Sequence, residues 1–567
     1  MSKYTHHNGE LNSKHLNQVV FLKGWVAKKR NLGGLVFIDL RDRFGITQLV
    51  VRPESEFHEA ASQLKPEYVI EVQGIVLKRE SVNSNIPTGE IEVEVNMLKV
   101  LNIAETPPII VSDNDDSLED TRLKYRYLDL RKPSQQKYLI KRHEITQAIR
   151  NVLVDQGFYE FETPILGKST PEGARDYLVP SRLYPGQFYA LPQSPQLYKQ
   201  LFMVAGFEKY FQIARCFRDE DLRADRQPEF TQVDIEASFV DQEDIMGVAE
   251  KVMKRLFEQF LNIKLTLPLP ILTYKQAMDD YGSDKPDIRF DLRLKDYTET
   301  FKTLPLFENA EVIKGILIES SPSITRKTID GYTALVKKNH GKMLAYLKNE
   351  NDVLSGSIAK LVPDYQLEVG KTLFLVGGTY EDVSQGLGAL RRQLASDLNL
   401  IDESKEGLLW VTDWPLLEYN EEDGRFYAMH HPFTAPQDEE TLRNNPKASL
   451  AKAYDIVWNG YEVGGGSIRI HRQDVQSLMF KTLGLSQYDI ENRFGYFTDA
   501  LKYGTPPHGG IAFGLDRLVM LITKTNNIKD VIAFPKTQSA KDLMSNAPDT
   551  VDDVQLEELH LKAKKDA

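Results

Sequence analysis

The sequence is poor in cysteine and has no long hydrophobic run. Cys216 is the only cysteine in 567 residues, which excludes an intramolecular disulfide and a zinc site built from several cysteines. No apolar stretch approaches the ~18 residues that a membrane-spanning helix needs. Residues 1–10 are polar, whereas a signal peptide has an apolar core. We therefore expect a cytoplasmic protein with no membrane partner.

The chain also lacks the overall basic charge that is typical of nucleic-acid-binding proteins. It has 70 Lys and Arg against 82 Asp and Glu, a net charge of −12. Hydrophobic residues make up 41% and charged residues 27%, as in folded globular proteins rather than disordered ones. At ~150 residues per domain, the length predicts three or four domains. A nucleic-acid ligand stays possible, because local charge decides binding.

Residues 19–101 show short alternating strands separated by turn signals. Leu35, Phe37 and Asp39 share one face of a predicted strand, and the other face is apolar. Roughly 100 residues of closely spaced strands are typical of a small barrel, of which the oligonucleotide-binding fold is one kind. A lone aromatic such as Phe37 is more often part of a core than a base-stacking platform.

Local charge in this part of the chain contrasts with the acidic whole. Residues 20–45 contain six basic and two acidic residues, a net charge of +4. The residues concerned are Lys23, Lys28, Lys29, Arg30, Arg41 and Arg43, with Asp39 and Asp42. A basic patch on a small barrel indicates contact with nucleic acid.

The middle of the chain shows a linker, a long helix and a segment without recognisable chemistry. A proline pair, an acidic run and a basic tail mark residues 106–133 as a linker. An apolar stripe then predicts a helix that ends near Gly157. The stripe consists of Ile140, Ile145, Ala148, Ile149, Val152 and Leu153. Residues 283–405 separate two stretches that do carry site-like residues, so we expect an inserted domain there, with a helix near 390–400.

A long charged loop at residues 218–229 joins two strand-like segments. On the second strand Phe230, Gln232, Asp234 and Glu236 share one face. A solvated hairpin would account for this pattern. A ligand that carries both negative phosphate and positive ammonium would also explain why both signs of charge line one surface.

Two further segments have the pattern of a nucleotide site. At residues 508–517 an apolar strand enters a helix through Gly514, which leaves Arg517 in the first helical turn. The helix dipole disfavours an arginine there unless it meets an anion, although a surface arginine is the alternative.

At Asn459-Gly460 a hairpin turn places Asp455 and Glu462 diagonally on one side. Such carboxylates repel each other unless a cation such as Mg²⁺ lies between them, or both are solvated.

Together these segments resemble the signature motifs of class II aminoacyl-tRNA synthetases. Residues 157–164 (GFYEFETP) are similar to motif 1, 217–236 to motif 2 and 510–517 to motif 3. More specific runs resemble the bacterial aspartyl branch of that class. They are residues 170–176 (TPEGARD), 193–199 (QSPQLYK), 430–432 (HHP) and 464–469 (GGGSIR).

The resemblance implies a multidomain α+β fold. An N-terminal OB-fold β-barrel would bind the anticodon, an antiparallel six-stranded sheet flanked by helices would be catalytic, and an inserted α/β domain would interrupt it. The expected limits are 1–105 for the barrel, 106–133 for the linker, 134–282 and 406–534 for the catalytic domain, 283–405 for the insertion and 535–567 for a C-terminal extension, with a surface helix from 551 to 567. Motif 1 implies a homodimer.

The resemblance also implies the function. The reaction would be ATP-dependent attachment of L-aspartate to tRNA(Asp) in two steps, through aspartyl-adenylate, with release of AMP and pyrophosphate. Aspartate would be bound by Glu172, Ser194, Gln196, Lys199, Arg218, Asp234, His430 and Arg469. Ser194, Gln196 and Asp234 would receive its ammonium group, and Lys199 and Arg469 its side-chain carboxylate. Glu172 would lie on a loop that closes over the site.

ATP and tRNA would be bound by further residues of the motifs. ATP would contact Arg218, Asp219, Glu220, Gln227, Phe230, Glu462, Gly514, Leu515, Asp516 and Arg517. Arg218, Glu462 and Arg517 would be catalytic, and Asp455 with Glu462 would hold Mg²⁺. The tRNA would contact Arg30, Phe37, Gln48, Glu92, Arg223 and Arg226.

Several alternatives stay open. A sister enzyme for asparagine or lysine would share the barrel and motifs, although two cations in the pocket would repel the ammonium of lysine. A tRNA-independent amide-forming ligase would need no barrel, and a catalytically silent RNA-binding regulator would be expected to lack Arg218, Glu462 or Arg517. Relatives that also charge tRNA(Asn) tend to carry histidine in the turn where this chain has Leu32, which favours strict specificity.

Overall fold

The structure, a computed structural model, describes residues 4–170, 174–220 and 226–563. The chain divides into two compact units, which are described separately. The first comprises residues up to 144, 222–227 and 523–551, and the second comprises 145–221, 228–522 and the residues from 552 onward. Among the described residues, no helix is long and apolar enough to cross a membrane.

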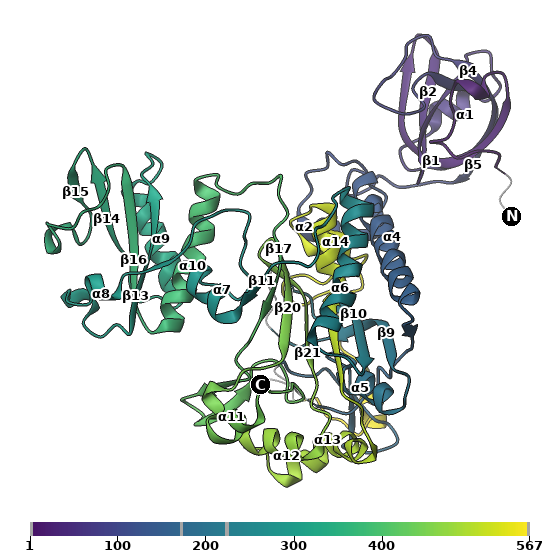
Figure 1. Cartoon of the computed structure of the whole chain (residues 1–567). Coiled ribbons are helices and arrows are strands. Elements are labelled where there is room, and N and C mark those ends of the chain that lie inside the picture. The colour runs from purple at the N-terminus through teal and green to yellow at the C-terminus, as the bar shows by residue number, and fades with distance from the viewer. Residues whose placement is uncertain (1–3, 171–173, 221–225, 564–567) are drawn as a thin grey trace. The chain divides into compact units, whose positions relative to one another are not determined.

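The first unit begins with the expected barrel, a closed sheet of five strands in the order β1-β2-β3-β5-β4 (Figure 1). Alternation builds it: Val36, Ile38 and Leu40 are buried in its core, while Leu35, Phe37 and Asp39 face outward. Its elements are η1 (Ser13–His15), β1 (Val19–Leu32), β2 (Leu35–Asp42), β3 (Gly45–Val51), α1 (His58–Gln63), β4 (Val69–Lys78) and β5 (Ile91–Asn102). The prediction of an OB-fold barrel is confirmed.

Short helices and a long one follow the barrel. They are α2 (Glu119–Lys124), α3 (Arg126–Asp129) and α4 (Pro133–Asp155), and the first unit also contains η7 (Ile528–Val531). Most of the predicted apolar stripe of α4 is buried, but Ile140 is 46% exposed, so the stripe was wrong at that position. After α4 the chain turns at Gly157, whose φ of 80° favours glycine.

The second unit contains an eight-stranded sheet in the order β11-β17-β20-β21-β22-β10-β9-β6. Its six central strands pair antiparallel, as the resemblance implied, and the two edge strands β11 and β6 pair parallel to their neighbours. The strands are β6 (Tyr159–Glu160), β9 (Lys209–Phe217), β10 (Glu229–Ser238), β11 (Ile271–Thr273), β17 (Leu408–Thr412), β20 (Ala453–Trp458), β21 (Tyr461–Ile468) and β22 (His508–Gly514).

Helices and two small hairpins surround this sheet. The helices are α5 (Gln196–Val204), α6 (Gln242–Leu256), η2 (Phe257–Leu261), α7 (Tyr274–Tyr281), α11 (Glu439–Asn444), η5 (Pro446–Ala448), α12 (Gln473–Thr482), α13 (Gln487–Ala500), η6 (Leu501–Tyr503) and α14 (Leu515–Thr523). The hairpins are β7 (Leu178–Pro180) with β8 (Phe188–Ala190), and β18 (Leu417–Asn420) with β19 (Arg425–Ala428). Helix α5 packs on β9 and β10, and α6 on β20 and β22. These contacts hold the polar face of β10 against α5.

Between α7 and β17 the chain forms a second sheet, in the order β12-β13-β16-β14-β15, with α9 and α10 packed against it (Figure 1). Its elements are β12 (Lys295–Asp296), α8 (Thr298–Phe301), η3 (Pro305–Phe307), β13 (Val312–Glu319), α9 (Arg326–Lys338), β14 (Ala345–Glu350), β15 (Val353–Ser355), η4 (Ala359–Leu361), β16 (Lys371–Gly378) and α10 (Tyr380–Asp397). These elements lie within residues 283–405, where the sequence predicts an inserted α/β domain. Helix α10 begins ten residues before the predicted position, because Thr379 caps its N-terminus.

The C-terminal helix is shorter than the sequence predicted. Helix α15 (Asp553–Glu558) has six residues and no buried side chain. A helix of this length without apolar packing gains little stability, since most helical stability in proteins comes from packing an apolar face.

Candidate active site

Four charged side chains from α5, β10 and the end of β21 meet in the interior of the second unit. Lys199 on α5 is 1% exposed, and its Nζ lies 3.0 Å from Asp234 Oδ1 and 3.4 Å from Glu236 Oε2. Arg469 donates from Nε to Glu236 Oε1 at 2.9 Å and from Nη2 to Glu236 Oε2 at 3.1 Å. The two cations expected to bind one carboxylate therefore share Glu236.

Sequence reasoning did not include Glu236 among the site residues. It is fully buried, and because β10 alternates, it lies two residues from Asp234 on the same polar face. A strand with carboxylates at two successive inward positions is unusual, since a buried carboxylate needs a partner. That pattern was the available signal, but only the fold shows that Arg469 is the partner.

Burial and neighbouring charge shift the pKa values of the two carboxylates in opposite directions. Burial raises the pKa of Asp234 above its ordinary value, and the charge of Lys199 offsets only part of this effect. Burial would also raise the pKa of Glu236, but the charges of Arg469 and Lys199 outweigh it and hold that pKa below its ordinary value. Glu236 is thus the fixed counter-charge of the two cations.

Two buried polar atoms at this cluster have no hydrogen-bond partner among the described residues. They are Asp234 Oδ2 and Gln196 Nε2. One is an acceptor and the other a donor, so a ligand with an ammonium and a carboxylate group would satisfy both. Gln196 is the first residue of α5, and Ser194 lies two residues before it.

His431 completes the surroundings of Arg469. Its Nε2 lies 2.6 Å from Arg469 Nη1, and its Nδ1 accepts from the Phe433 main-chain N–H at 3.2 Å. Burial lowers the pKa of His431 well below its ordinary value, and the charge of Arg469 lowers it further. His431 is therefore a neutral ring in contact with the arginine.

The cluster opens into a cavity of about 560 Å³ within the second unit. Its lining includes the expected aspartate residues Ser194, Gln196, Lys199, Arg218, Asp234, His430 and Arg469, and the expected nucleotide residues Glu220, Asp455 and Glu462. The guanidinium of Arg218 lies 5.1 Å from the centre of the Phe230 ring, an arrangement typical of a cation–π contact. One cavity thus brings together side chains from four separate stretches of the chain.

The two carboxylates proposed as metal ligands lie side by side, as the hairpin register predicted. Trp458 pairs with Tyr461 and Val457 with Glu462, and a bulge then pairs Asp455 with Gly465. Burial raises the pKa of Asp455 to about 6, nearby His430, whose Nε2 lies 3.7 Å from Asp455 Oδ1, lowers it, and the charge of Glu462 raises it further. Two close carboxylates are a ligand pair that would hold one Mg²⁺.

Motif 3 runs from β22, which pairs with β21 in the sheet, into α14. Arg517 stands in the first turn of α14 and donates from Nη1 to the main-chain oxygen of Glu462. Asp516 accepts a hydrogen bond from the Thr231 main chain at 2.8 Å, which fastens α14 to β10. Three of the residues expected to contact ATP have a structural place here. Asp516 binds the main chain of β10, and Gly514 and Leu515 form the junction between β22 and α14.

Contacts with Arg175 hold Asp219, near the start of the charged loop. Arg175 Nε lies 3.5 Å from Asp219 Oδ2, and the Asp219 main chain donates to the Arg175 carbonyl at 3.1 Å. Two residues named from the resemblance, Glu172 and Arg223, lie outside the described residues. Gln227 and Arg226 belong to the first unit, where Gln227 pairs with the main chain of Lys536.

The expected anticodon residues form one cluster on the barrel. Arg30 donates to Gln48 Oε1 at 3.3 Å, and Gln48 Nε2 donates to Glu92 Oε2 at 2.9 Å. Arg30 also faces Phe37 across the β1–β2 pair. Arg79, which sequence reasoning missed, donates to Gln48 Oε1 at 2.8 Å. Burial raises the pKa of Glu92.

The antiparallel sheet, its charged pocket and the attached barrel define the class, a class II tRNA synthetase. The family model for tRNA synthetases class II (D, K and N) matches residues 118–538, and the model for the OB-fold nucleic acid binding domain matches residues 20–101.

Known proteins resemble the chain over nearly its whole length. An aspartate–tRNA ligase of Aster yellows witches'-broom phytoplasma (strain AYWB) is 51% identical over 99% of both chains. An aspartate–tRNA(Asp/Asn) ligase of Geobacillus sp. (strain WCH70) is 52% identical over 98% of both chains. Within its class, the chain belongs to the aspartate–tRNA ligase family.

Solved structures share the fold. The asparaginyl-tRNA synthetase from Pyrococcus horikoshii complexed with asparaginyl-adenylate has a TM-score of 0.61 at 21% identity, over 95% of this chain and 99% of that one. The aspartyl tRNA synthetase from Entamoeba histolytica has a TM-score of 0.59 at 19% identity, over 94% of this chain and 91% of that one.

Proposed function

We propose that the protein attaches L-aspartate to tRNA in two ATP-dependent steps, through aspartyl-adenylate. The observation that carries this proposal is the buried pair of cations, Lys199 and Arg469, held on Glu236 beside a cavity. Glu236 and Asp234 balance the two cations in the free protein; once Asp234 pairs with the ammonium group of the substrate, one positive charge is left over, and the side-chain carboxylate of aspartate would balance it. An asparagine amide would leave that positive charge without its partner, and breaking a buried pair costs roughly 3–5 kcal/mol.

The unsatisfied atoms support the orientation of the amino acid. The ammonium group would bind Asp234 Oδ2, and the side-chain carboxylate would lie toward Lys199 and Arg469. This leaves the α-carboxylate toward Arg218, which lines the same cavity. Sites that are built around polar partners discriminate by about 10⁴–10⁵-fold without editing.

In the first step the α-carboxylate attacks the α-phosphorus of ATP in line, and pyrophosphate leaves. Arg218 would neutralise charge at the α-phosphate, and Arg517 would hold the γ-phosphate end. Positioning and neutralisation supply most of the rate in such a transfer, so no strong base is needed. In the second step a terminal ribose hydroxyl of the tRNA attacks the mixed anhydride, and AMP leaves.

Asp455 and Glu462 would hold Mg²⁺. The fit rests on their adjacency and on Asp455 Oδ1, a buried oxygen without a hydrogen-bond partner among the described residues. A bound Mg²⁺ would neutralise phosphate charge and orient the leaving group.

The tRNA partner would be tRNA(Asp), with the barrel reading the anticodon through Arg30, Phe37, Gln48 and Glu92. Relatives named for both tRNA(Asp) and tRNA(Asn) are as similar to this chain as those named for aspartate alone. Leu32 in the barrel turn favours strict specificity for tRNA(Asp), and charging of both is the alternative.

The protein would act as a cytoplasmic homodimer. Large apolar side chains are exposed on the motif 1 segment and on the neighbouring β7–β8 hairpin, and such patches mark interaction surfaces. They are Tyr159, Ile165, Leu166, Leu178, Phe188 and Tyr189. Sedimentation equilibrium should give twice the chain mass of 64.8 kDa, and a monomer would contradict this part of the proposal.

The function is tested by charging tRNA(Asp) and tRNA(Asn) with labelled aspartate in the presence of ATP. We expect charging of tRNA(Asp) that Arg469→Leu abolishes while ATP binding survives. Arg215→Leu is the matched control, because Arg215 is an exposed arginine of β9 that pairs with Glu229. Charging that persists in Arg469→Leu at near the wild-type rate would overturn the assignment of the pocket.

A further inference from the structure

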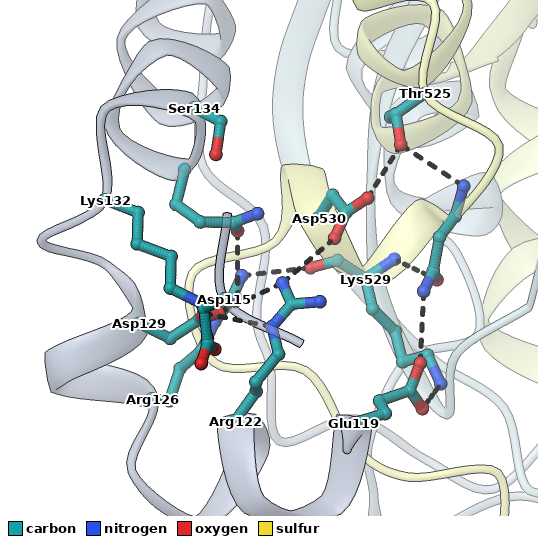
Figure 2. Close-up of polar contacts among 12 residues, drawn as sticks. Asp115, Glu119, Arg122, Arg126, Asp129, Lys132, Ser134, Thr525, Lys529 and Asp530 are labelled. Atoms are coloured by element: carbon teal, nitrogen blue, oxygen red, sulfur yellow. Dashed lines mark hydrogen bonds and ion pairs between the residues drawn. The ribbon is translucent and has the colours of Figure 1, made fainter. Parts of the chain in front are cut away.

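A polar network in the first unit joins the linker helices to the segment of residues 523–537, which we call the strap (Figure 2). Arg126, which is 3% exposed, is at its centre. Its guanidinium donates to the main-chain oxygens of Lys529 at 3.2 Å, Ile532 at 3.0 Å and Ala533 at 2.9 Å. These three acceptors all lie on the strap.

The other donors of Arg126 fix it to the linker and to α4. Nη1 donates to Asp129 Oδ2 at 2.6 Å and to Gln135 Oε1 at 3.0 Å. A guanidinium has five N–H donors, and these contacts use all five. A lysine, with its compact point charge and three donors, would not reproduce this planar arrangement.

Neighbouring charges hold Asp129 in turn. Asp129 is fully buried and accepts from Arg122 Nε at 3.0 Å and from Lys132 Nζ at 2.7 Å. Lys132 also contacts Asp115 at 2.7 Å. Each buried charge has a partner of opposite sign, so the position of Arg126 is rigidly determined.

The strap ends on the charged loop of motif 2. The main-chain N–H of Lys536 donates to Gln227 Oε1 at 2.8 Å, and Gln227 Nε2 donates back to the Lys536 oxygen at 3.1 Å. Gln227 is buried, and only Pro228 separates it from the start of β10. Two reciprocal hydrogen bonds thus fix the residue through which the loop enters the strand that carries Phe230.

We infer that Arg126 is a positioning residue for ATP: by pinning the strap, it holds Gln227 and so the end of the motif 2 loop. This inference rests on the proposed function, because it assigns the loop to ATP. All five donors of Arg126 bind protein acceptors, which leaves none for a substrate. Its contribution reaches the nucleotide only through the main chain of the strap and the amide of Gln227.

The test is a double-mutant cycle of Arg126→Lys and Gln227→Ala, read by aspartate-dependent ATP–pyrophosphate exchange without tRNA. Each single change should raise the KM for ATP about tenfold, as expected for a lost hydrogen-bonded contact, and leave the KM for aspartate unchanged. Because both act through one contact, the double variant should be no worse than Gln227→Ala alone. If the increases in the KM for ATP of the two single variants multiply in the double variant, the inference is overturned.

A purely structural role for Arg126 predicts a different result, a lower kcat with an unchanged KM for ATP, because fewer molecules would be folded. Glu119→Gln is the matched control, since Glu119 contacts the strap through the side chains of Lys529 and Asn527 rather than through its main-chain oxygens. It should behave as wild type. If Arg126→Lys does not fold, Gln135→Met removes one acceptor of Arg126 and takes its place in the cycle. Wild-type protein without exchange would instead contradict the proposed function.

Discussion

At the scale of single residues, the pocket depends on how four buried charges balance. Lys199 and Arg469 both contact Glu236, and Lys199 also contacts Asp234. The pKa of Asp234 is raised by its burial, whereas that of Glu236 is lowered by the two cations, so the two acids differ in role. Glu236 stabilises the cations, and Asp234 keeps an oxygen for the substrate.

The first prediction concerns His431. Burial and the charge of Arg469 hold its pKa well below 6.5, so the ring should stay neutral at physiological pH. We expect its ¹³C resonance, assigned by comparison with His431→Gln, to be constant from pH 5.5 to 8. A titration with a midpoint near 6.5 would show that the ring is protonated beside Arg469, which the geometry does not allow.

The second prediction concerns Phe37, which faces outward from the barrel beside Arg30. Phe37→Ala should raise the KM for tRNA in charging by 5- to 150-fold, because base stacking contributes about 1–3 kcal/mol. Exchange without tRNA should not change. Phe21→Ala removes an aromatic from β1 and is the control. Equal loss of charging and exchange in Phe37→Ala would indicate a folding role instead.

At the scale of elements, the β20–β21 hairpin determines where the metal ligands lie. A side chain at Gly465 would place its Cβ 2.7 Å from Asp455 Oδ1 and 3.5 Å from Glu462 Oε1. The absence of a side chain there is what allows both carboxylates to face one point. The ligand pair is thus a property of the hairpin rather than of two independent residues.

The third prediction follows from this contact. Gly465→Ala should displace Asp455, raise the Mg²⁺ concentration needed for half-maximal exchange by about tenfold, and leave the fold intact. Gly247→Ala is the control, because nothing lies within 4 Å of a Cβ at that helical position. An unchanged Mg²⁺ requirement in Gly465→Ala would show that these carboxylates do not hold the ion.

The fourth prediction concerns the linker network. Burial would raise the pKa of Asp129, but hydrogen bonds from Arg122 and Lys132 outweigh it, and the pKa lies below the ordinary 3.8. Its stabilising effect is therefore complete above about pH 5 and lost as the pH falls below 3.8. Asp129→Asn should lower the free energy of unfolding by about 3–5 kcal/mol at pH 7.

Urea unfolding at pH 7, 5 and 3.5 measures this effect. The difference between Asp129→Asn and wild type should shrink at pH 3.5, where the Asp129 carboxylate of the unfolded chain begins to be protonated. Asp116→Asn, which changes an exposed carboxylate of the same linker, should match wild type throughout. A difference that is the same at every pH would mean that the charge of Asp129 is not what stabilises the linker.

At the scale of the whole molecule, local patterns predicted much of the fold. Asn459-Gly460 predicted the hairpin and its first two residue pairs, but not the bulge that shifts the register beyond Val457, and the alternation around Phe37 predicted the barrel strands. Contacts between distant parts of the chain could not be predicted in this way. Arg469 meets Glu236 across 233 residues, and Lys536 meets Gln227 across 309, so both partners appear only when the sheet and the strap have formed.

Errors arose where a periodic pattern continued beyond the packed part of an element. Ile140 fits the apolar stripe of α4, yet its side chain is exposed. The C-terminal pattern likewise extends beyond α15, which has no buried residue. Periodicity indicates which face could be buried, but tertiary packing decides which part of that face is.

Lys199 and Arg469 together would select a side-chain carboxylate over an amide. The most direct measurement is kcat/KM for ATP–pyrophosphate exchange with L-aspartate and with L-asparagine. We expect a preference for aspartate of about 10⁴-fold or more in the wild-type protein, and we expect Arg469→Leu to abolish exchange with aspartate. Comparable exchange with both amino acids in the wild-type protein would contradict it.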